Sequence, residues 1–338
     1  MNNHTVIGVD LAKTVFQVAV QHGQKITSNK KLNRSKLVEF MTQQLPSVVV
    51  MEACYTAHYW ARVCEALGHT VRLIPAQHVK PFTRGNKTDA NDAIAIIEAA
   101  QRPNMIDVPV KTQHQQDIQS LHRIRERLVC NRTGLMNQVR GLLAEYGLIS
   151  AKGNKGFVAL IELALNTDEL SPLIKDEVQR SLDELQLLRD RTEAIEATLR
   201  EYLKSDPHCQ IISTIPGIGV INATALVCKF GNGSQFSKAR SLAVNLGLTP
   251  KLSASGLRSQ MQGISKRGDP YLRKQLIHGA RALLGVCDKR PDDALCRWAS
   301  RIKQRRGGKI ATVAIANRLA RLVWVLLHKQ EAYRPMPV

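Results

Sequence analysis

Four acidic residues stand where their side chains could share metal ions. Asp10 and Glu52 each follow directly on a short apolar run, and Asp89 and Asp92 lie three residues apart at the start of a helix-like segment. Two Mg²⁺ ions about 3.5–4 Å apart can hold the attacking and leaving oxygens of a phosphodiester. Carboxylate oxygens are the ligands that Mg²⁺ prefers. The four acids therefore indicate metal-dependent chemistry on a nucleic acid.

The segments around these acids predict an α/β sheet. The apolar runs before Asp10 and Glu52 are rich in β-branched residues and have the length of buried strands. A helix is expected to begin near Thr88 or Asp89, which places both helical acids on one face of its first turn. The strand order and spacing fit an RNase H-like sheet. Strands are expected over residues 5–9, 15–21, 47–51 and 70–74, and the first two should form an antiparallel hairpin. A helix is expected over residues 56–67.

Each acid taken alone has a simpler interpretation. Asp10 and Glu52 could merely end strands, and Asp89 and Asp92 could merely favour the start of a helix. The joint pattern favours a metal site, because four carboxylates that converged without a counter-charge would repel one another strongly.

The positive charge of the chain is concentrated in its last third. The 338 residues carry a net charge of +20, of which residues 1–110 contribute +4 and residues 111–205 contribute none. Residues 206–338 hold 22 basic and 6 acidic residues, a net charge of +16. We expect three domains with these boundaries, and we expect the last to bind nucleic acid, the commonest polyanionic partner.

Several classes of protein are disfavoured. The seven cysteines are widely spaced and form no Cys-x-x-Cys pair, which argues against a disulfide framework and a zinc site. No apolar run approaches the length of a membrane span, and the N-terminus has no signal-peptide pattern. A cytoplasmic protein is expected.

The neutral middle region has the pattern of two long helices. Apolar residues recur at intervals of three and four, and Gly147 follows the first series as a stop. An antiparallel coiled coil is the simplest pairing, and its second helix would be up to about 50 Å long. The two series are Ile118, Leu121, Ile124, Leu128, Leu135, Val139, Leu142 and Tyr146, and Ile174, Val178, Leu182, Leu185, Leu188, Thr192, Ile195, Leu199 and Tyr202.

A glycine turn opens the basic region. Residues 211–227 resemble a helix-hairpin-helix, in which the backbone N–H groups of Gly217 and Gly219 could approach a phosphate. A purely structural turn between two packed helices is the alternative.

Five segments in a fixed order carry a family resemblance. Together they resemble the DEDD-type transposases related to the Piv DNA invertases, which are insertion-sequence recombinases guided by a bridge RNA. The resemblance covers nearly the whole chain, and the ordered combination is more specific than any single motif. The segments are Asp10-Leu11-Ala12-Lys13, Met51-Glu52-Ala53, and residues 87–93, 245–256 and 263–273.

The resemblance implies a composite active site. It implies an N-terminal RuvC-like domain, a coiled coil, and a mainly helical C-terminal domain with an essential serine before a glycine, which by position is Ser255. In the family this serine is taken to attack DNA and hold a strand end as a phosphoserine, completed by the acids and their Mg²⁺. A serine hydroxyl is a weak nucleophile unless a base or metal activates it. Ser253 is a rival in the same loop, and a hydrogen-bonding turn without catalysis is a further alternative.

The resemblance also implies partners. Donor and target DNA, a bridge RNA, and a homo-oligomer are expected, with a dimer and a tetramer in the synaptic complex, so that the two halves of the site meet from different protomers. Lys266, Arg267, Arg273 and Lys274 are expected to neutralise phosphates. A further basic block, usable for RNA or DNA, consists of Arg301, Lys303, Arg305, Arg306 and Lys309.

Three classes of function follow from these features. The favoured one is a serine-dependent, Mg²⁺-assisted DNA recombinase or transposase, active in the bacterial cytoplasm at the nucleoid. A RuvC-like junction nuclease that uses water as its nucleophile is the second. A basic scaffold without catalysis is the third, and the four acids argue against it.

Overall fold

The computed structural model describes residues 5–83, 88–103, 105–255 and 258–335. The chain forms two compact units, one of Met1–Gln116 with Lys229–Leu242 and one of Asp117–Cys228 with Ala243–Val338. The charge pattern predicted three domains with boundaries near 110 and 205. That three-domain division stays a prediction; within the second unit, a 2.9 Å hydrogen bond between His122 and Tyr271 joins the neutral middle region to the basic region.

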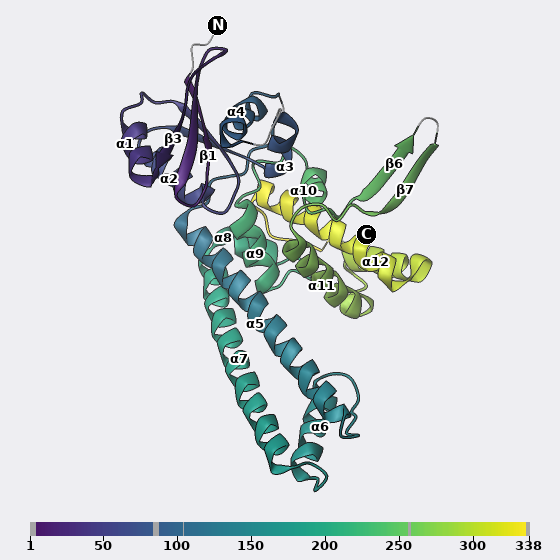
Figure 1. Cartoon of the computed structure of the whole chain (residues 1–338). Helices are drawn as coiled ribbons and strands as arrows, with labels where there is room; N and C mark the ends of the chain where they lie inside the picture. Colours follow the sequence, from purple (N-terminus) through teal and green to yellow (C-terminus); the bar gives the residue numbers. More distant parts are fainter. Residues whose placement is uncertain (1–4, 84–87, 104, 256–257, 336–338) are drawn as a thin grey trace. The chain divides into compact units, whose positions relative to one another are not determined.

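The first unit is built on a mixed five-stranded sheet (Figure 1). Its strand order is β3-β2-β1-β4-β5. The first strand pairs antiparallel with the second and parallel with the fourth, which in turn pairs parallel with the fifth. The predicted strands and hairpin are therefore confirmed. The strands are β1 (Thr5–Asp10), β2 (Val15–His22), β3 (Lys25–Asn33), β4 (Val48–Glu52) and β5 (Thr70–Ile74).

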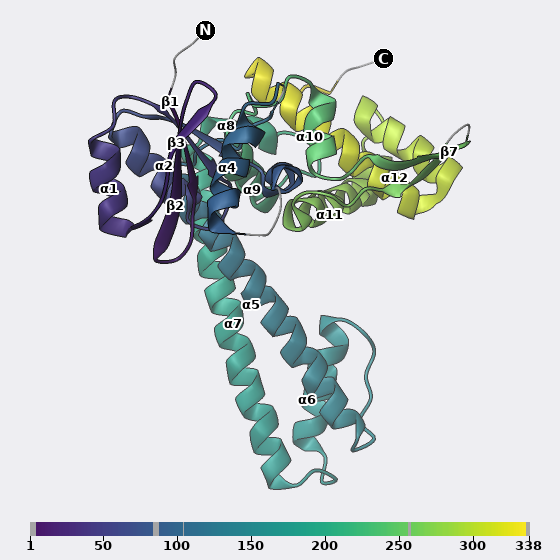
Figure 2. The ribbon, with the colours of Figure 1, turned by 45° about the horizontal axis from the view of Figure 1, so that its top comes forward.

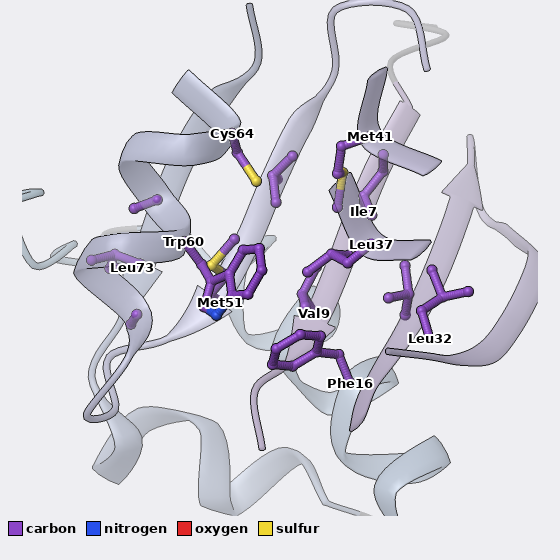
Figure 3. Close-up of a cluster of buried hydrophobic side chains, with 14 residues drawn as sticks. Ile7, Val9, Phe16, Leu32, Leu37, Met41, Met51, Trp60, Cys64 and Leu73 are labelled. Atoms are coloured by element: carbon purple, nitrogen blue, oxygen red, sulfur yellow. The ribbon is translucent and has the colours of Figure 1, made fainter. Parts of the chain in front are cut away.

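One face of this sheet packs against α1 (Arg34–Thr42) and α2 (Ala57–Ala66). Ile7, Val9 and Met51 point to this face, and Phe16 meets Trp60 edge-on with ring centroids 4.9 Å apart (Figure 3). This core of large apolar side chains fixes which residues of each strand must point the other way, because successive side chains of a strand alternate between faces.

The other face packs against α4 (Asp89–Ala100). Thr88, one of the two N-cap residues that the sequence allowed, caps this helix by accepting from the backbone N–H of Asn91. The helix sits very close to the sheet, because a Cβ built on Gly8 would lie 2.5 Å from a side-chain carbon of Ile97. Short helical turns, α3 (Ala76–Val79) and η1 (Lys80–Phe82), lead from β5 toward α4.

Besides the short turns α3 and η1, the strand β3 and the helix α1 of this unit were not predicted. The third strand is the polar edge of the sheet, and most of its side chains are exposed or half-buried. An edge strand buries little apolar surface, so its sequence lacks the apolar alternation by which the other strands were recognised.

The second unit contains two long helices and a shorter third. Helices α5 (Gln113–Ala144) and α7 (Pro172–Ser205) correspond to the predicted pair, and an ion pair of 2.6 Å between Arg125 and Glu196 joins them. At their far ends α6 (Asn154–Asn166) packs between the two in a shared apolar core (Figures 1 and 2).

The simple two-helix coiled coil predicted for this region is therefore corrected at its distal end. Helix α6 carries Phe157, Leu160 and Ile161 into the shared core, so the buried stripe of α5 turns toward it. In consequence Leu143 is fully buried, whereas the predicted core residues Leu142 and Tyr146 are exposed.

The rest of the second unit is a helical bundle with a projecting hairpin (Figure 1). The hairpin pairs β6 with β7 antiparallel, and every residue of β6 is exposed. Its base is fixed, because Asn317 of the last helix donates to the carbonyl of Leu248. The elements are α8 (Pro207–Ser213), α9 (Val220–Phe230), β6 (Pro250–Ser255), β7 (Arg258–Ile264), α11 (Pro270–Val286), η2 (Cys287–Lys289) and α12 (Ala294–Lys329). The last two residues of α9 and the first four of α10 (Ala239–Asn245) fall in the segment Lys229–Leu242, which belongs to the first unit.

The last helix corrects the expectation that no segment approaches a membrane span. By length and composition α12 is apolar enough to cross a membrane. Half of its apolar stretch is buried inside the protein, where α12 packs on α8 and α11. It is the core helix of this unit, and it is broken at Gly307, whose φ of 78° is not helical.

Candidate active site

Asp10 and Glu52 lie side by side on the sheet. They end the adjacent parallel strands β1 and β4, directly after the register partners Val9 and Met51. Since Ile7, Val9 and Met51 face α1 and α2, alternation turns both carboxylates to the face that α4 covers. Both side chains are half-buried. The predicted convergence of these two acids is thus a property of the strand register.

The first turn of α4 lies over the same end of the sheet. Asp92 is half-buried, and its carboxylate accepts a hydrogen bond of 3.4 Å from the hydroxyl of Thr83. Asp89 is exposed and forms an ion pair of 3.2 Å with Lys31 on the edge strand β3. The structure therefore holds Asp89 at the edge of the sheet. Asp10, Glu52 and Asp92 lie nearer the centre of the sheet.

A polar link ties the first turn of α4 to the sheet. Gln17 of β2 is the antiparallel register partner of Asp10 and donates through Nε2 to Oδ1 of Asn29 at 2.6 Å. Asn29 donates in turn to the carbonyl of Ala90 at 3.0 Å. Neither Gln17 nor Asn29 was identified from the sequence, although both glutamines of β2 fall on the strand face opposite Phe16 and Val18.

The oxygens gathered here suit a hard divalent cation. Mg²⁺ keeps several waters and is commonly held by only one or two carboxylates together with substrate phosphates. Among the residues that the structure describes, no three His, Cys, Asp or Glu side chains are close enough to hold one ion. The adjacent pair Asp10 and Glu52 meets the smaller requirement, and the buried Oε1 of Gln17, which has no hydrogen-bond partner among the described residues, adds an acceptor beside it.

Ser253 and Ser255 lie on the projecting hairpin. The segment predicted as a loop is strand β6, in which Ser253 pairs with Gln260 and Ser255 is the last residue. Both serines are exposed, and alternation along the strand puts them on one face. Gly256, the other half of the serine motif, lies outside the described residues.

The basic residues predicted to bind phosphates divide into two pairs. Lys266 and Arg267 are exposed. Arg273 donates to the carbonyls of Leu246 and Arg267, each at 3.1 Å, and Lys274 is paired with Glu126. Arg273 and Lys274 thus hold the hairpin base and α11 in place in this structure.

The two glycines of the predicted phosphate-binding turn also differ. Gly217 has a φ of 90°, and a Cβ on it would lie 2.6 Å from the carbonyl oxygen of Gly279 in α11. Its lack of a side chain is explained by this packing, which is the structural alternative considered above. A Cβ on Gly219 would meet no atom of the described residues within 4 Å, so that position leaves room for a ligand.

His122 belongs to a buried network that is separate from these acids. Its two ring nitrogens lie 2.9 Å from the hydroxyls of Tyr271 and Thr224. Since Thr224 donates its own proton to the carbonyl of Val220, it accepts from Nε2–H of a neutral imidazole. Burial, with a smaller contribution from the charge of Arg125, lowers the pKa of His122 to about 4. His122 is therefore a buried packing residue.

The sequence matches two transposase families. Residues 7–148 match the DEDD_Tnp_IS110 transposases, and residues 209–295 match the family described as "Transposase IS116/IS110/IS902 family". The first match includes all four acids, and the second includes both glycines of the turn, the serine hairpin and α11.

Full-length relatives decide the identity. A "Probable family 20 transposase" of Pseudomonas aeruginosa is 45% identical over 98% of this chain and 99% of its own length. The chain belongs to the IS110/IS116 family of transposases. A transposase for insertion sequence element IS1111A of Coxiella burnetii is 41% identical over 99% of this chain and 92% of its own length. A transposase for insertion sequence element IS1328 of Yersinia enterocolitica is 36% identical over 96% of this chain and 97% of its own length.

Membership in this family establishes the class of activity. The protein is a transposase of an insertion sequence, an enzyme that cleaves and transfers DNA strands. The mixed α/β unit that holds Asp10, Glu52, Asp89 and Asp92 is compatible with an RNase H-like DEDD domain.

Proposed function

We propose that this transposase cleaves DNA at the end of the sheet formed by β1 and β4, in the manner of a RuvC-like nuclease. The observation that carries the proposal is the placement of Asp10 and Glu52 on adjacent parallel strands, beneath the helix turn that holds Asp92. The N-terminal end of α4 faces the same edge, and its partial positive charge favours an approaching phosphate.

The acids and the substrate would divide the work. Asp10 and Glu52 would hold a divalent ion, Mg²⁺ being the expected one, and Asp92 and Asp89 would join them as further ligands. When bound, the ion supplies a Lewis acid that stabilises the charge developing on the phosphate oxygens. The oxygen of a water would bond to phosphorus and release a proton to solvent, the bond from phosphorus to the leaving strand oxygen would break, and that oxygen would take up a proton.

Substitution of the central acid tests the proposal. We expect Asp10→Asn to lower metal-dependent strand cleavage by at least about a hundredfold while the thermal unfolding of the protein stays unchanged. Glu39→Gln is the matched control, because Glu39 is an exposed acid on α1 of the same unit. Cleavage at the normal rate by the Asp10 variant would refute the metal site.

A second candidate nucleophile is Ser255. The observation in its favour is its exposed position at the end of β6. In this mechanism Ser255 Oγ would form a bond to phosphorus and displace the strand oxygen, leaving a phosphoserine that a strand hydroxyl later resolves. Activation by the metal of Asp10 and Glu52 would require that the two halves of the site meet, in a dimer or in a synaptic tetramer.

Trapping distinguishes the two nucleophiles. The protein is incubated with Mg²⁺ and a nicked DNA substrate, with and without the transcript of the insertion sequence, and is then denatured. The serine mechanism predicts a protein–DNA adduct that Ser255→Ala abolishes and Ser253→Ala leaves intact. An adduct absent from the wild type under conditions of full cleavage would favour water.

The remaining expectations concern partners and location. We propose that the basic residues of the second unit, Lys266 and Arg267 among them, bind DNA and a structured bridge RNA, as in recombinases related to the Piv invertases. The support is the net charge of +16 on residues 206–338. Action on the bacterial chromosome would place the protein in the cytoplasm. Copurification of a defined RNA with the intact protein, lost at high salt, tests this.

A further inference from the structure

Gln17 is buried beside Asp10 with one of its two polar atoms unsatisfied. Its side chain is 5% exposed, and it is the cross-strand partner of Asp10 in the β1–β2 register. Cross-strand partners point to the same sheet face with Cβ atoms about 4.5–5.5 Å apart. Among the described residues, Oε1 of Gln17 has no hydrogen-bond partner. A buried acceptor without a donor is costly, so a donor or cation from outside the chain is indicated.

The orientation of this amide follows from its neighbours. The carbonyl of Ala90 can only accept, so Asn29 must present its Nδ2 to Ala90 and its Oδ1 to Gln17. Gln17 must then donate through Nε2 to that oxygen. The end of the amide that is left over is therefore the oxygen, and rotating the amide by 180° would break the link to Asn29.

A second glutamine of the same strand shows that such burial does not by itself leave an atom unsatisfied. Gln21 lies on the same face of β2 and is 8% exposed. It donates to the carbonyl of Gly23 at 2.6 Å and accepts from Gln101 at 2.9 Å. Both ends of its amide are satisfied, and its register partner is Val6 rather than an acid.

We infer that Gln17 is a further residue of the metal site, whose Oε1 accepts a hydrogen bond from a water bound to the divalent ion of Asp10 and Glu52. This inference rests on the proposed function. Ionised carboxylates and an amide oxygen are all acceptors, so none of them can satisfy another. A hydrated cation can take the carboxylates as its ligands while one of its waters donates to Oε1 of Gln17. Through Asn29 the same side chain links this site to the first turn of α4, between Asp89 and Asp92.

Metal affinity without DNA tests this inference. Mn²⁺ is titrated into the full chain by calorimetry, and the thermal unfolding of each variant is followed without metal. We expect Gln17→Leu to weaken Mn²⁺ binding by about tenfold, the loss typical of an outer-sphere partner. Gln21→Leu, the matched control, should leave the affinity within about twofold of the wild type. Equal affinities for the Gln17 and Gln21 variants would overturn the inference.

A conservative variant separates a role toward the metal from a role as a tether. Gln17→Glu keeps an oxygen beside Asp10 but can no longer donate to Asn29. We expect it to bind Mn²⁺ at least as tightly as the wild type, whereas a tether alone predicts the same loss as Gln17→Leu. This variant also decides the matter if Gln17→Leu does not fold. Asp10→Asn serves as the separate check, because unchanged Mn²⁺ binding in that variant refutes the proposed metal site itself.

Discussion

Gly8 of β1 leaves no room for a side chain against the backbone of Ala93 in α4. A Cβ built on Gly8 would lie 2.6 Å from the carbonyl oxygen of Ala93. Ala93 directly follows Asp92 in α4, and Gly8 lies two residues before Asp10 in β1. Ala19, the register partner of Gly8, is the other small residue on this face and belongs to the same core as Ala93 and Ile97. Small residues on two neighbouring strands thus let the helix approach closely enough to bring its acid toward the strand ends.

Substitution of Gly8 should therefore weaken metal binding, although Gly8 is not itself a ligand. We expect Gly8→Ala to destabilise the protein by about 1–3 kcal/mol, the usual cost of overpacking. It should also weaken Mn²⁺ binding, because α4 must move away from β1. Urea unfolding and metal titration measure the two effects.

The matched control for this substitution is Gly263→Ala. Gly263 also lies in a strand, but a Cβ there would meet no atom of the described residues within 4 Å. Its stability should stay within about 0.5 kcal/mol of the wild type. If Gly8→Ala behaved like Gly263→Ala, the close approach of α4 would not be what positions Asp92.

The strands that carry the acids could be predicted because their sequences report burial directly. The apolar runs before Asp10 and Glu52 are short and β-branched, which favours a buried strand, and the two strand ends are adjacent in the sheet. Gln17 could not be found in this way. In an alternating strand a glutamine predicts a solvated face, and only the presence of α4 on that face makes it a buried residue.

Lys31 should compete with a metal ion for Asp89. The two side chains are more than half exposed and form an ion pair of 3.2 Å, so Asp89 must leave Lys31 before it can join the other acids. An exposed pair is worth at most about 1 kcal/mol, which corresponds to about fivefold in affinity. We expect Lys31→Gln to tighten Mn²⁺ binding by about two- to fivefold in low salt.

Lys25→Gln is the comparison for this effect. Lys25 lies at the other end of the same edge strand, opposite His22, and is also exposed. Its removal changes the net charge equally but leaves the partner of Asp89 in place. Equal tightening in both variants would mean that only the overall charge matters, and weaker binding in Lys31→Gln would contradict the competition.

The two glycines of the turn before α9 should separate folding from binding. Gly217→Ala adds a Cβ at a φ of 90° and 2.6 Å from the carbonyl oxygen of Gly279, so we expect a loss of at least about 2 kcal/mol. Gly219→Ala meets no described atom within 4 Å and should leave the stability unchanged.

DNA binding at fixed salt then tests the phosphate contact. If the backbone at Gly219 approaches a phosphate, Gly219→Ala should weaken binding severalfold in a protein of normal stability. Unchanged binding would leave the turn with a structural role only. The sequence could not separate these glycines, because the close approach of Gly217 to Gly279 joins residues 62 positions apart.

The second unit shows how one unrecognised element shifts a prediction. The helical repeat of α7 was assigned to the residues that are in fact buried, such as Leu185 and Leu199. The repeat of α5 was misassigned near Leu142, because the short helix α6 was not predicted and α5 turns its side chains to meet it. Periodicity finds a stripe, whereas the neighbour that covers the stripe decides which residues are buried.

The buried network of His122 should make the protein sensitive to mild acid. Its pKa of about 4 in the folded protein lies below the ordinary value of 6.5, so the unfolded chain binds the proton more readily. The contribution of neutral His122 to the free energy of unfolding is therefore fully present above about pH 6.5 and is lost as the pH falls toward 4. From these two pKa values we expect a loss of about 2 kcal/mol between pH 7 and pH 5. Urea unfolding of the full chain at pH 7 and pH 5 measures this loss. The variant His122→Gln cannot take up the proton. It should be less stable than the wild type at pH 7, but its free energy of unfolding should fall much less between the two pH values. If the wild type and His122→Gln lost the same free energy between pH 7 and pH 5, His122 would not be the group that titrates.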